Sequence, residues 1–138
     1  MTDKYKQMKK DIQFPKVLDV YVAAVYVLNE SFNTYEWNIY LINNFSTAIE
    51  TVLVVSKGGD TTKSTSVLRK QIKVLPAKSF VKLEYLHDDL LSVENRFLVS
   101  YFIDHQLFDK SYSFAPNSIS QKNSVDIPII PEKGILAK

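Results

Sequence analysis

The chain consists of short runs of β-type residues separated by polar turn signals, and no run has a convincing helical period. The seven runs lie at residues 18–28, 35–43, 48–56, 67–75, 80–86, 97–103 and 108–114. Turns this short cannot supply the long crossover connections that a parallel sheet requires. The sequence therefore predicts an all-β fold, an immunoglobulin-like antiparallel two-sheet sandwich of about seven strands.

Alternation along these runs indicates which side chains face the core, because successive residues of a strand point to opposite faces. The aromatic residues expected on inward faces are Trp37, Phe97, Tyr101 and Phe114. In the fourth run Val74 falls on the same face as Leu68 and Ile72. In the fifth run Tyr85 shares a face with Leu83.

We expect three parts along the chain: a basic flexible arm at 1–16, the sandwich domain at 17–116 and an extended C-terminal arm at 117–138. The first part carries five lysines against two aspartates, whereas the whole chain has a net charge of only +2. The chain from Pro116 onward holds three of the five prolines. Because Pro128 and Pro131 cannot donate to a central ladder, this part is predicted to form an edge strand or an arm that packs on the domain or on a partner.

The chain has no cysteine, so disulfides and thiolate metal sites are excluded, in agreement with a reducing compartment. Its N-terminus has lysines without a following apolar run, which differs from a secretory signal. The apolar runs are also shorter than the roughly 20 residues of a membrane helix. We therefore expect a cytoplasmic protein that does not bind membranes.

The residues offer little for catalysis. The glycine-rich stretch 56–66 lacks the glycine that a phosphate-binding loop needs before Lys63, and a strand follows it, so a flexible loop is expected. His87 stands beside Asp88 and Asp89, a set that could ligate a metal, although consecutive side chains rarely converge on one ion. No catalytic residue and no cofactor are predicted.

A second apolar face raises the question of what covers it. If the first, second and fifth strands share a sheet, as in immunoglobulin-like folds, then Tyr21, Val25, Tyr40 and Ile42 lie together on an outer surface. Leu98 and Phe102 are also apolar on their second face. Large exposed apolar patches are uncommon on monomers, so something should cover them.

Two covers are open. One is the chain's own C-terminal arm, whose apolar residues include Ile127, Ile129 and Ile130. The other is an unknown protein partner or a second copy of the chain in a homodimer, docking on the face or adding a strand at an edge. These three isoleucines and the four residues of the outer surface are the interaction candidates.

The stretches TYEWNIYLINNFSTAIETVLVVSKGGD, STSVLRKQIKVLPAKSFVKLE and IPIIPEKGILAK resemble a family of small uncharacterised immunoglobulin-like proteins from Bacteroidetes. Some members are labelled phenylalanyl-tRNA synthetase alpha subunit. This chain is far too short for a synthetase catalytic domain and contains no class II motif, so that activity is not expected. The resemblance implies a standalone cytoplasmic domain and supplies no site residues.

The sequence therefore favours a non-enzymatic protein-interaction module that uses an outer sheet face, a sheet edge or the C-terminal arm. A nucleic-acid accessory protein that uses the basic arm at 1–16 is the alternative, although the near-neutral remainder of the chain does not favour nucleic acid as the partner. A metal-dependent enzyme at the His/Asp turn is the second alternative.

Overall fold

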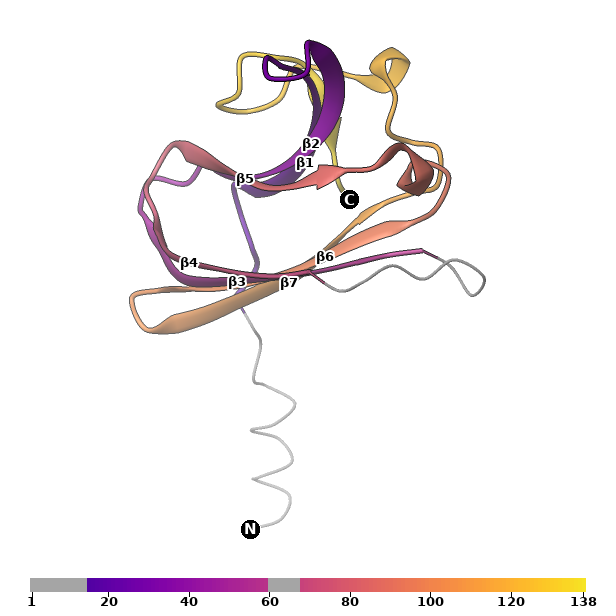
Figure 1. Ribbon diagram of the computed structural model, residues 1–138. Coiled ribbons are helices and arrows are strands. Elements are labelled where there is room, and N and C mark those ends of the chain that lie inside the picture. The colour runs from indigo at the N-terminus through magenta and orange to yellow at the C-terminus, as the bar shows by residue number, and fades with distance from the viewer. Residues whose placement is uncertain (1–14, 60–67) are drawn as a thin grey trace, which may run out of the picture.

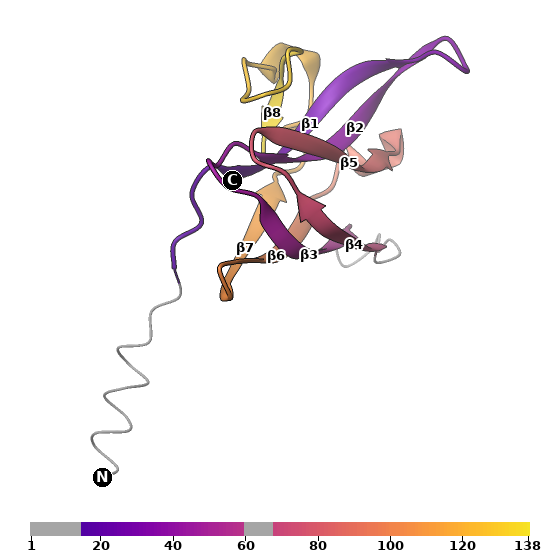
Figure 2. The ribbon, with the colours of Figure 1, turned by 90° about the vertical axis from the view of Figure 1, so that its left-hand side faces the viewer.

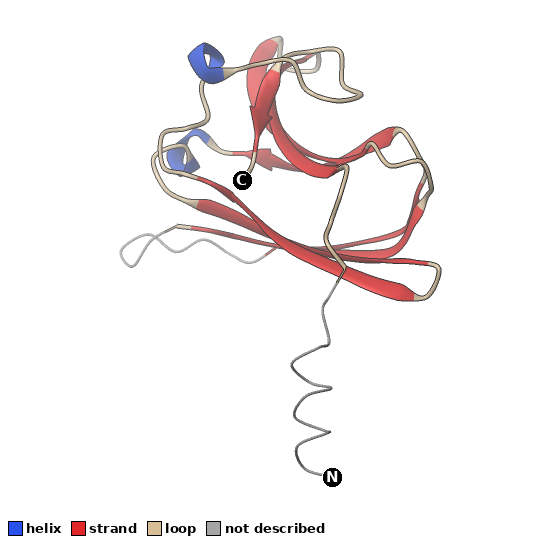
Figure 3. Cartoon of the chain, turned by 180° about the vertical axis from the view of Figure 1, so that it is seen from behind, coloured by secondary structure: helices blue, strands red, loops and turns tan. Residues whose placement is uncertain are grey.

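The computed structural model describes residues 15–59 and 68–138, which form two antiparallel sheets packed face to face (Figure 1). The strand order is β5-β2-β1-β8 in one sheet and β4-β3-β6-β7 in the other. The strands are β1 (Val20–Asn29), β2 (Thr34–Asn43), β3 (Ile49–Gly58), β4 (Leu68–Leu75), β5 (Ser79–Leu86), β6 (Asn95–Ile103), β7 (Gln106–Phe114) and β8 (Gly134–Leu136). Two short 3₁₀ turns, η1 (Asp88–Leu90) and η2 (Gln121–Asn123), are the helical elements of the described residues (Figure 3). The predicted all-β sandwich is confirmed.

Strands β1 to β7 coincide with the seven predicted runs, with ends that differ by two residues or fewer. The eighth strand, β8, comes from the C-terminal part of the chain and pairs with β1 at the edge of its sheet. The predicted arm at 1–16 and the loop at 56–66 lie largely outside the described residues.

The main core fills the space between the sheets. Trp37, Phe97, Tyr101 and Phe114 are all buried there, as alternation predicts. Burial raises the pKa of Tyr101 to about 12. The hydroxyl of Tyr112 donates a hydrogen bond of 2.6 Å to the Val20 carbonyl, which ties β7 to the opposite sheet.

Two irregularities overturn the predicted faces of Val74 and Tyr85. The register of β3 shifts between Glu50 and Leu53, where Thr51 has a positive φ of 49°. Beside this irregularity Val74 is 51% exposed and the following leucine is buried instead. The β2/β5 register shifts similarly, so that Tyr85 is 47% exposed. Beyond an extra residue in a strand, the side chains that would have faced the core point to the opposite face. This reversal explains why the predicted faces of Val74 and Tyr85 were wrong.

The end of the chain joins the two sheets along one edge of the sandwich. β8 runs antiparallel to β1, and the amide of Ala137 donates to the Val22 carbonyl at 2.9 Å. One residue later, Lys138 exchanges two backbone hydrogen bonds of 2.9 and 3.0 Å with Ser113 of β7. Figure 2 shows β8 beside β1, with the rest of the C-terminal segment beyond it.

Candidate functional site

The predicted outer surface exists, and it is covered. Tyr21 pairs with Ile42 across β1 and β2, and Tyr40 lies in the neighbouring row, so these side chains share the outer face of the β5-β2-β1-β8 sheet. Val25 lies on the same face. Val25 and Ile42 are nevertheless 0% exposed, because a second apolar cluster forms over them.

The cover is the chain's own C-terminal segment. Ile130 is buried in this outer cluster, and Ile127 and Ile129 pack against it. The strand that follows, β8, contributes side chains to both faces of the sheet. Leu136 packs against the outer cluster, and Ile135 packs against the main core. Of the two covers left open by the sequence, the structure therefore shows the intramolecular one.

The His/Asp turn is exposed and is organised by local hydrogen bonds. His87 caps η1, and its Nδ1 accepts a hydrogen bond from the Asp89 amide at 3.1 Å. The same Nδ1 lies 3.5 Å from Asp89 Oδ2. Asp88 is the first residue of η1. Within residues 15–59 and 68–138, no group of three or more His, Cys, Asp or Glu side chains is placed to hold a metal ion.

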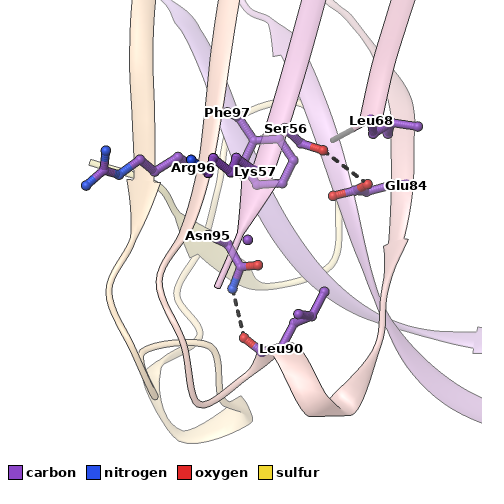
Figure 4. A pocket seen from close by; sticks show the side chains of 9 residues that line it. Ser56, Lys57, Leu68, Glu84, Leu90, Asn95, Arg96 and Phe97 are labelled. Carbon is purple, nitrogen blue, oxygen red and sulfur yellow. Dashed lines mark hydrogen bonds between the residues drawn. The ribbon is translucent and has the colours of Figure 1, made fainter. Parts of the chain in front are cut away.

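A small cavity of about 170 Å³ opens at one end of the sandwich, lined by residues of β3, β4, β5, β6 and η1 (Figure 4). In Figure 4 the side chains of Ser56 and Glu84 point toward one another from opposite sheets, and the Ser56 hydroxyl donates to Glu84 Oε2 at 3.4 Å. Asn95 donates to the carbonyls of Leu90 and Val93 at 2.8 and 3.1 Å, which fixes the β5/β6 connection.

Burial raises the pKa of Glu84, and the hydrogen bond from Ser56 partly offsets that effect. The cavity is smaller than the roughly 300 Å³ at which ligand pockets begin. Its lining holds the Glu84 carboxylate and the Ser56 hydroxyl, together with the Asn95 amide and the basic residues Lys57 and Arg96. Ser56 and Asn95 both donate hydrogen bonds to other groups of the protein.

The outer face of the other sheet, β4-β3-β6-β7, carries apolar side chains that no part of the described chain covers. We call this set the open face. Its central row runs from Val55 on β3 to Leu98 on β6, and Leu98 is 46% exposed. Its apolar members are Leu53, Val55, Val74, Leu98, Phe102 and Leu107.

The open face is hollowed beside the β3 irregularity. A depression of about 310 Å³ lies there, lined by Leu53, Gln71, Lys73, Phe102 and others. Sequence reasoning identified Leu98 and Phe102 as apolar on their second face, but it missed the other four members. The signal for Leu53 and Val55 was the continuous apolar run VLVV, which marks a strand that is apolar on both faces.

Comparison with protein-family models, curated proteins and solved structures finds no match to this chain. The resemblance to Bacteroidetes proteins therefore stays a prediction. No helix in the described part of the chain is long and apolar enough to cross a membrane.

Proposed function

We propose that the protein is a non-enzymatic interaction module that binds through the open face, and that its partner there is a second copy of the chain. The observation that carries the proposal is the contrast between the two outer faces. One is sealed by the C-terminal segment. The other carries six apolar side chains across four strands, of which Val74, Leu98 and Leu107 are exposed and the other three are half-buried. Exposed apolar patches on folded proteins mark interaction sites.

The sheet edges are guarded, which argues against strand addition. On the edge strand β4, Lys70 pairs with Val54, a buried residue, and therefore points inward; its Nζ donates to the Lys82 carbonyl at 2.8 Å. On the other edge, β7, Lys110 pairs with the buried Val99 and lies over the Tyr112 ring, 4.8 Å from its centroid. Inward-pointing charges are a known protection of edge strands.

The charges at the two sides of the open face suit a two-fold pair. At one end of the face Lys57 and Arg96, which pair across β3 and β6, are both basic, and Arg96 is bonded to Glu94 at 2.6 Å. Arg69 and Lys73 lie on β4 at one side of the face, and Asp109 lies on β7 at the other. A row of cross-strand partners runs from Gln71 on β4 to Asp109 on β7. Arg69 and Lys73 lie in the two neighbouring rows, so each is displaced by one row along the strands from Asp109. A two-fold axis parallel to the strands places β4 of one copy over β7 of the other. Arg69 and Lys73 then approach the aspartate, and the contact occurs twice.

The size of the face agrees with a stable contact. Four strands spaced about 4.8 Å apart and about eight residues long at 3.3 Å each span a projected area of roughly 500 Å². Because side chains project from the sheet, the accessible area of the face is larger than this projected area. It approaches the roughly 800 Å² per partner that standard interfaces bury. Two sheet faces that pack in this way form an ordinary aligned sandwich contact.

The strand order supports an immunoglobulin-like identity for the module. The first, second and fifth strands share one sheet, whereas the third, sixth and seventh share the other. In the constant-type immunoglobulin arrangement the fourth strand joins the first sheet, but here it pairs with the third strand. Domains of this architecture serve many unrelated functions, so the functional proposal rests on the face and not on the fold.

Sedimentation equilibrium of the full chain tests the proposal. We expect twice the chain mass, and we expect Leu98→Asp to sediment as a monomer because a charge replaces a half-exposed apolar contact. Val125→Asp is the matched control, since Val125 is 55% exposed on the C-terminal segment and should leave the mass unchanged. A wild-type chain that stays monomeric at every concentration would contradict the proposal.

A charge-reversal pair tests the orientation. Arg69→Glu and Asp109→Lys should each weaken self-association, because each places like charges together. An equimolar mixture of the two variants should restore a dimer containing one copy of each. At one end of that dimer the introduced glutamate faces the introduced lysine, and at the other end the unchanged Arg69 faces the unchanged Asp109. Failure of the mixture to associate would exclude this two-fold arrangement.

A further inference from the structure

The β1/β2 hairpin extends past the sandwich (Figure 2). A third hollow lies between this hairpin and the end of β5, away from the open face. We call it the hairpin groove. Its volume is about 660 Å³, within the range of ligand sites. It is lined by Asn29, Phe32, Thr34, Tyr35, Glu36, Lys82, Tyr85 and Asp88.

Three aromatic rings around the groove are strongly exposed. Phe32 is 77% exposed at the hairpin turn, Tyr35 is 61% exposed on β2, and Tyr85 is 47% exposed on β5. Tyr35 stacks on Tyr26 with ring centroids 5.3 Å apart, so one of its faces is fixed by the fold. Aromatic residues that the fold holds at the surface are typical of binding sites, because their large flat faces offer contact area at a low entropic cost.

The polar lining is acidic in a chain whose net charge is positive. Glu36 and Asp88 line the groove against the single cation Lys82, and Asp89 follows directly on η1. Glu36 is held in place, since Asn29 Nδ2 donates to its Oε1 at 2.6 Å and Lys82 Nζ lies 3.9 Å from its Oε2. Asp88 lines the groove from the other side, at the start of η1.

We infer that the hairpin groove binds an arginine side chain presented by an extended peptide of a partner protein. A guanidinium group stacks on aromatic faces through its plane and bonds a carboxylate with two parallel N–H groups, so it matches both features of the lining. The volume of about 660 Å³ exceeds what one side chain fills, which leaves room for the flanking peptide. This site is independent of the open face and involves none of its residues.

Amide chemical shifts of the ¹⁵N-labelled full chain, titrated with blocked tetra-arginine, test the inference. The expected shifts cluster at residues 29–36 and 82–88. The neutral isostere tetra-citrulline should bind at least about tenfold more weakly, because it stacks without the charge. Equal binding of the two peptides, or shifts spread over the whole surface, would overturn the inference.

Substitutions in the groove test whether tetra-arginine binds there. Tyr85→Ala should weaken tetra-arginine binding about threefold to fivefold and Asp88→Asn about twofold to fivefold, in line with exposed cation–π and ion-pair contributions. The matched controls are Phe80→Ala and Asp104→Asn, an exposed aromatic and an exposed aspartate outside the groove. All four positions are exposed or lie in turns, and a thermal melt of each variant checks that the fold is intact. Unchanged affinity of both groove variants would overturn the inference.

A neutral ligand tests whether the groove prefers a cationic or an uncharged ligand. Aromatic grooves with amide and carboxylate groups also suit sugars, so cellotetraose is titrated in parallel. If cellotetraose shifts the groove amides more strongly than tetra-arginine, and Asp88→Asn leaves arginine binding unchanged, the ligand is not cationic and the inference is wrong.

Discussion

Glu84 is the residue whose position is most unusual for its chemistry. It pairs with Ile39 across β2 and β5 and so points between the sheets, next to the register shift of β5. The Ser56 hydroxyl is its hydrogen-bond donor, and Glu84 lines the small cavity at this end of the sandwich. Because burial raises the pKa of Glu84, the folded chain binds a proton at this carboxyl more tightly than the unfolded chain does.

This difference predicts a specific pH dependence of stability. A raised pKa in the folded state means that the stabilising contribution is complete below the unfolded pKa, near 4.5, and is lost as pH rises through the folded value. Glu84→Gln removes the ionisation, so the variant should gain in urea midpoint over the wild type as pH rises from 4 to 7. Glu132→Gln, an exposed substitution, is the control and should show no such trend. A difference that is constant across this range would contradict the prediction.

Sequence patterns give no sign of a buried polar side chain whose hydrogen-bond acceptors are distant carbonyls. Asn43 stands at a strand end before a polar turn, yet it is 0% exposed. Its Nδ2 donates to the carbonyls of Thr47, Leu75 and Pro76 at 3.0 to 3.1 Å. Two of these acceptors lie more than 30 residues away along the chain, so no local pattern could have indicated the burial.

At the scale of elements, the C-terminal segment depends on one close approach. Gly134 of β8 lies against β1, where an added Cβ would sit 2.6 Å from the Ala24 carbonyl oxygen, 3.0 Å from Ile127 Cδ1 and 3.1 Å from Val25 Cγ2. The amide and carbonyl of Gly134 also pair with Val125, which closes the loop that carries the covering isoleucines. Glycine is therefore required where the segment turns onto the sheet.

Gly134→Ala should destabilise the protein by about 1–3 kcal/mol, because the methyl group forces β8 away from a backbone atom that cannot move aside. The displaced segment would also uncover Val25 and Ile42, so binding of a hydrophobic dye to the native protein should rise. Urea titration and dye fluorescence measure the two effects. Lys133→Ala, one residue earlier and exposed, is the control. An alanine variant with unchanged stability and dye binding would show that the segment tolerates a shift.

The elements themselves were largely predictable, and their irregularities were not. Alternation of apolar residues located β1 to β7 because each strand buries one face in a common core. Alternation cannot show where an extra residue will reverse the pattern, which is why Val74 and Tyr85 were placed on the wrong face. The isoleucines of the C-terminal segment showed that it is apolar, but not whether the surface that it covers belongs to its own domain.

At the scale of the whole molecule, the sandwich has two protected edges and two different outer faces. The C-terminal residues bond to Ser113 of β7, and β8, which ends its sheet, has only three residues. On the opposite side Lys70 of β4 bonds to the β5 carbonyl of Lys82. The association that we propose therefore uses the open face and not the edges, and it closes as a symmetric pair instead of propagating.

Lys70 and Lys110 protect the edges of the sheet and lie outside the open face. Substituting them therefore removes edge protection without altering the open face. In Lys70→Val combined with Lys110→Val, valine favours the strand conformation and removes the charge that opposes pairing with another chain. The double variant should fold and retain near-native stability, yet it should aggregate faster than the wild type on mild heating, with a larger rise in thioflavin fluorescence and light scattering.

The control for this variant is Lys122→Val combined with Lys133→Val, which loses the same two charges from the exposed C-terminal segment. If both double variants aggregate equally, the cause is the lower net charge and not the unprotected edges. If only the edge variant aggregates, and Leu98→Asp added to it does not suppress the aggregation, growth proceeds through the edges. That result would separate uncontrolled strand pairing from the closed association that we propose for the open face.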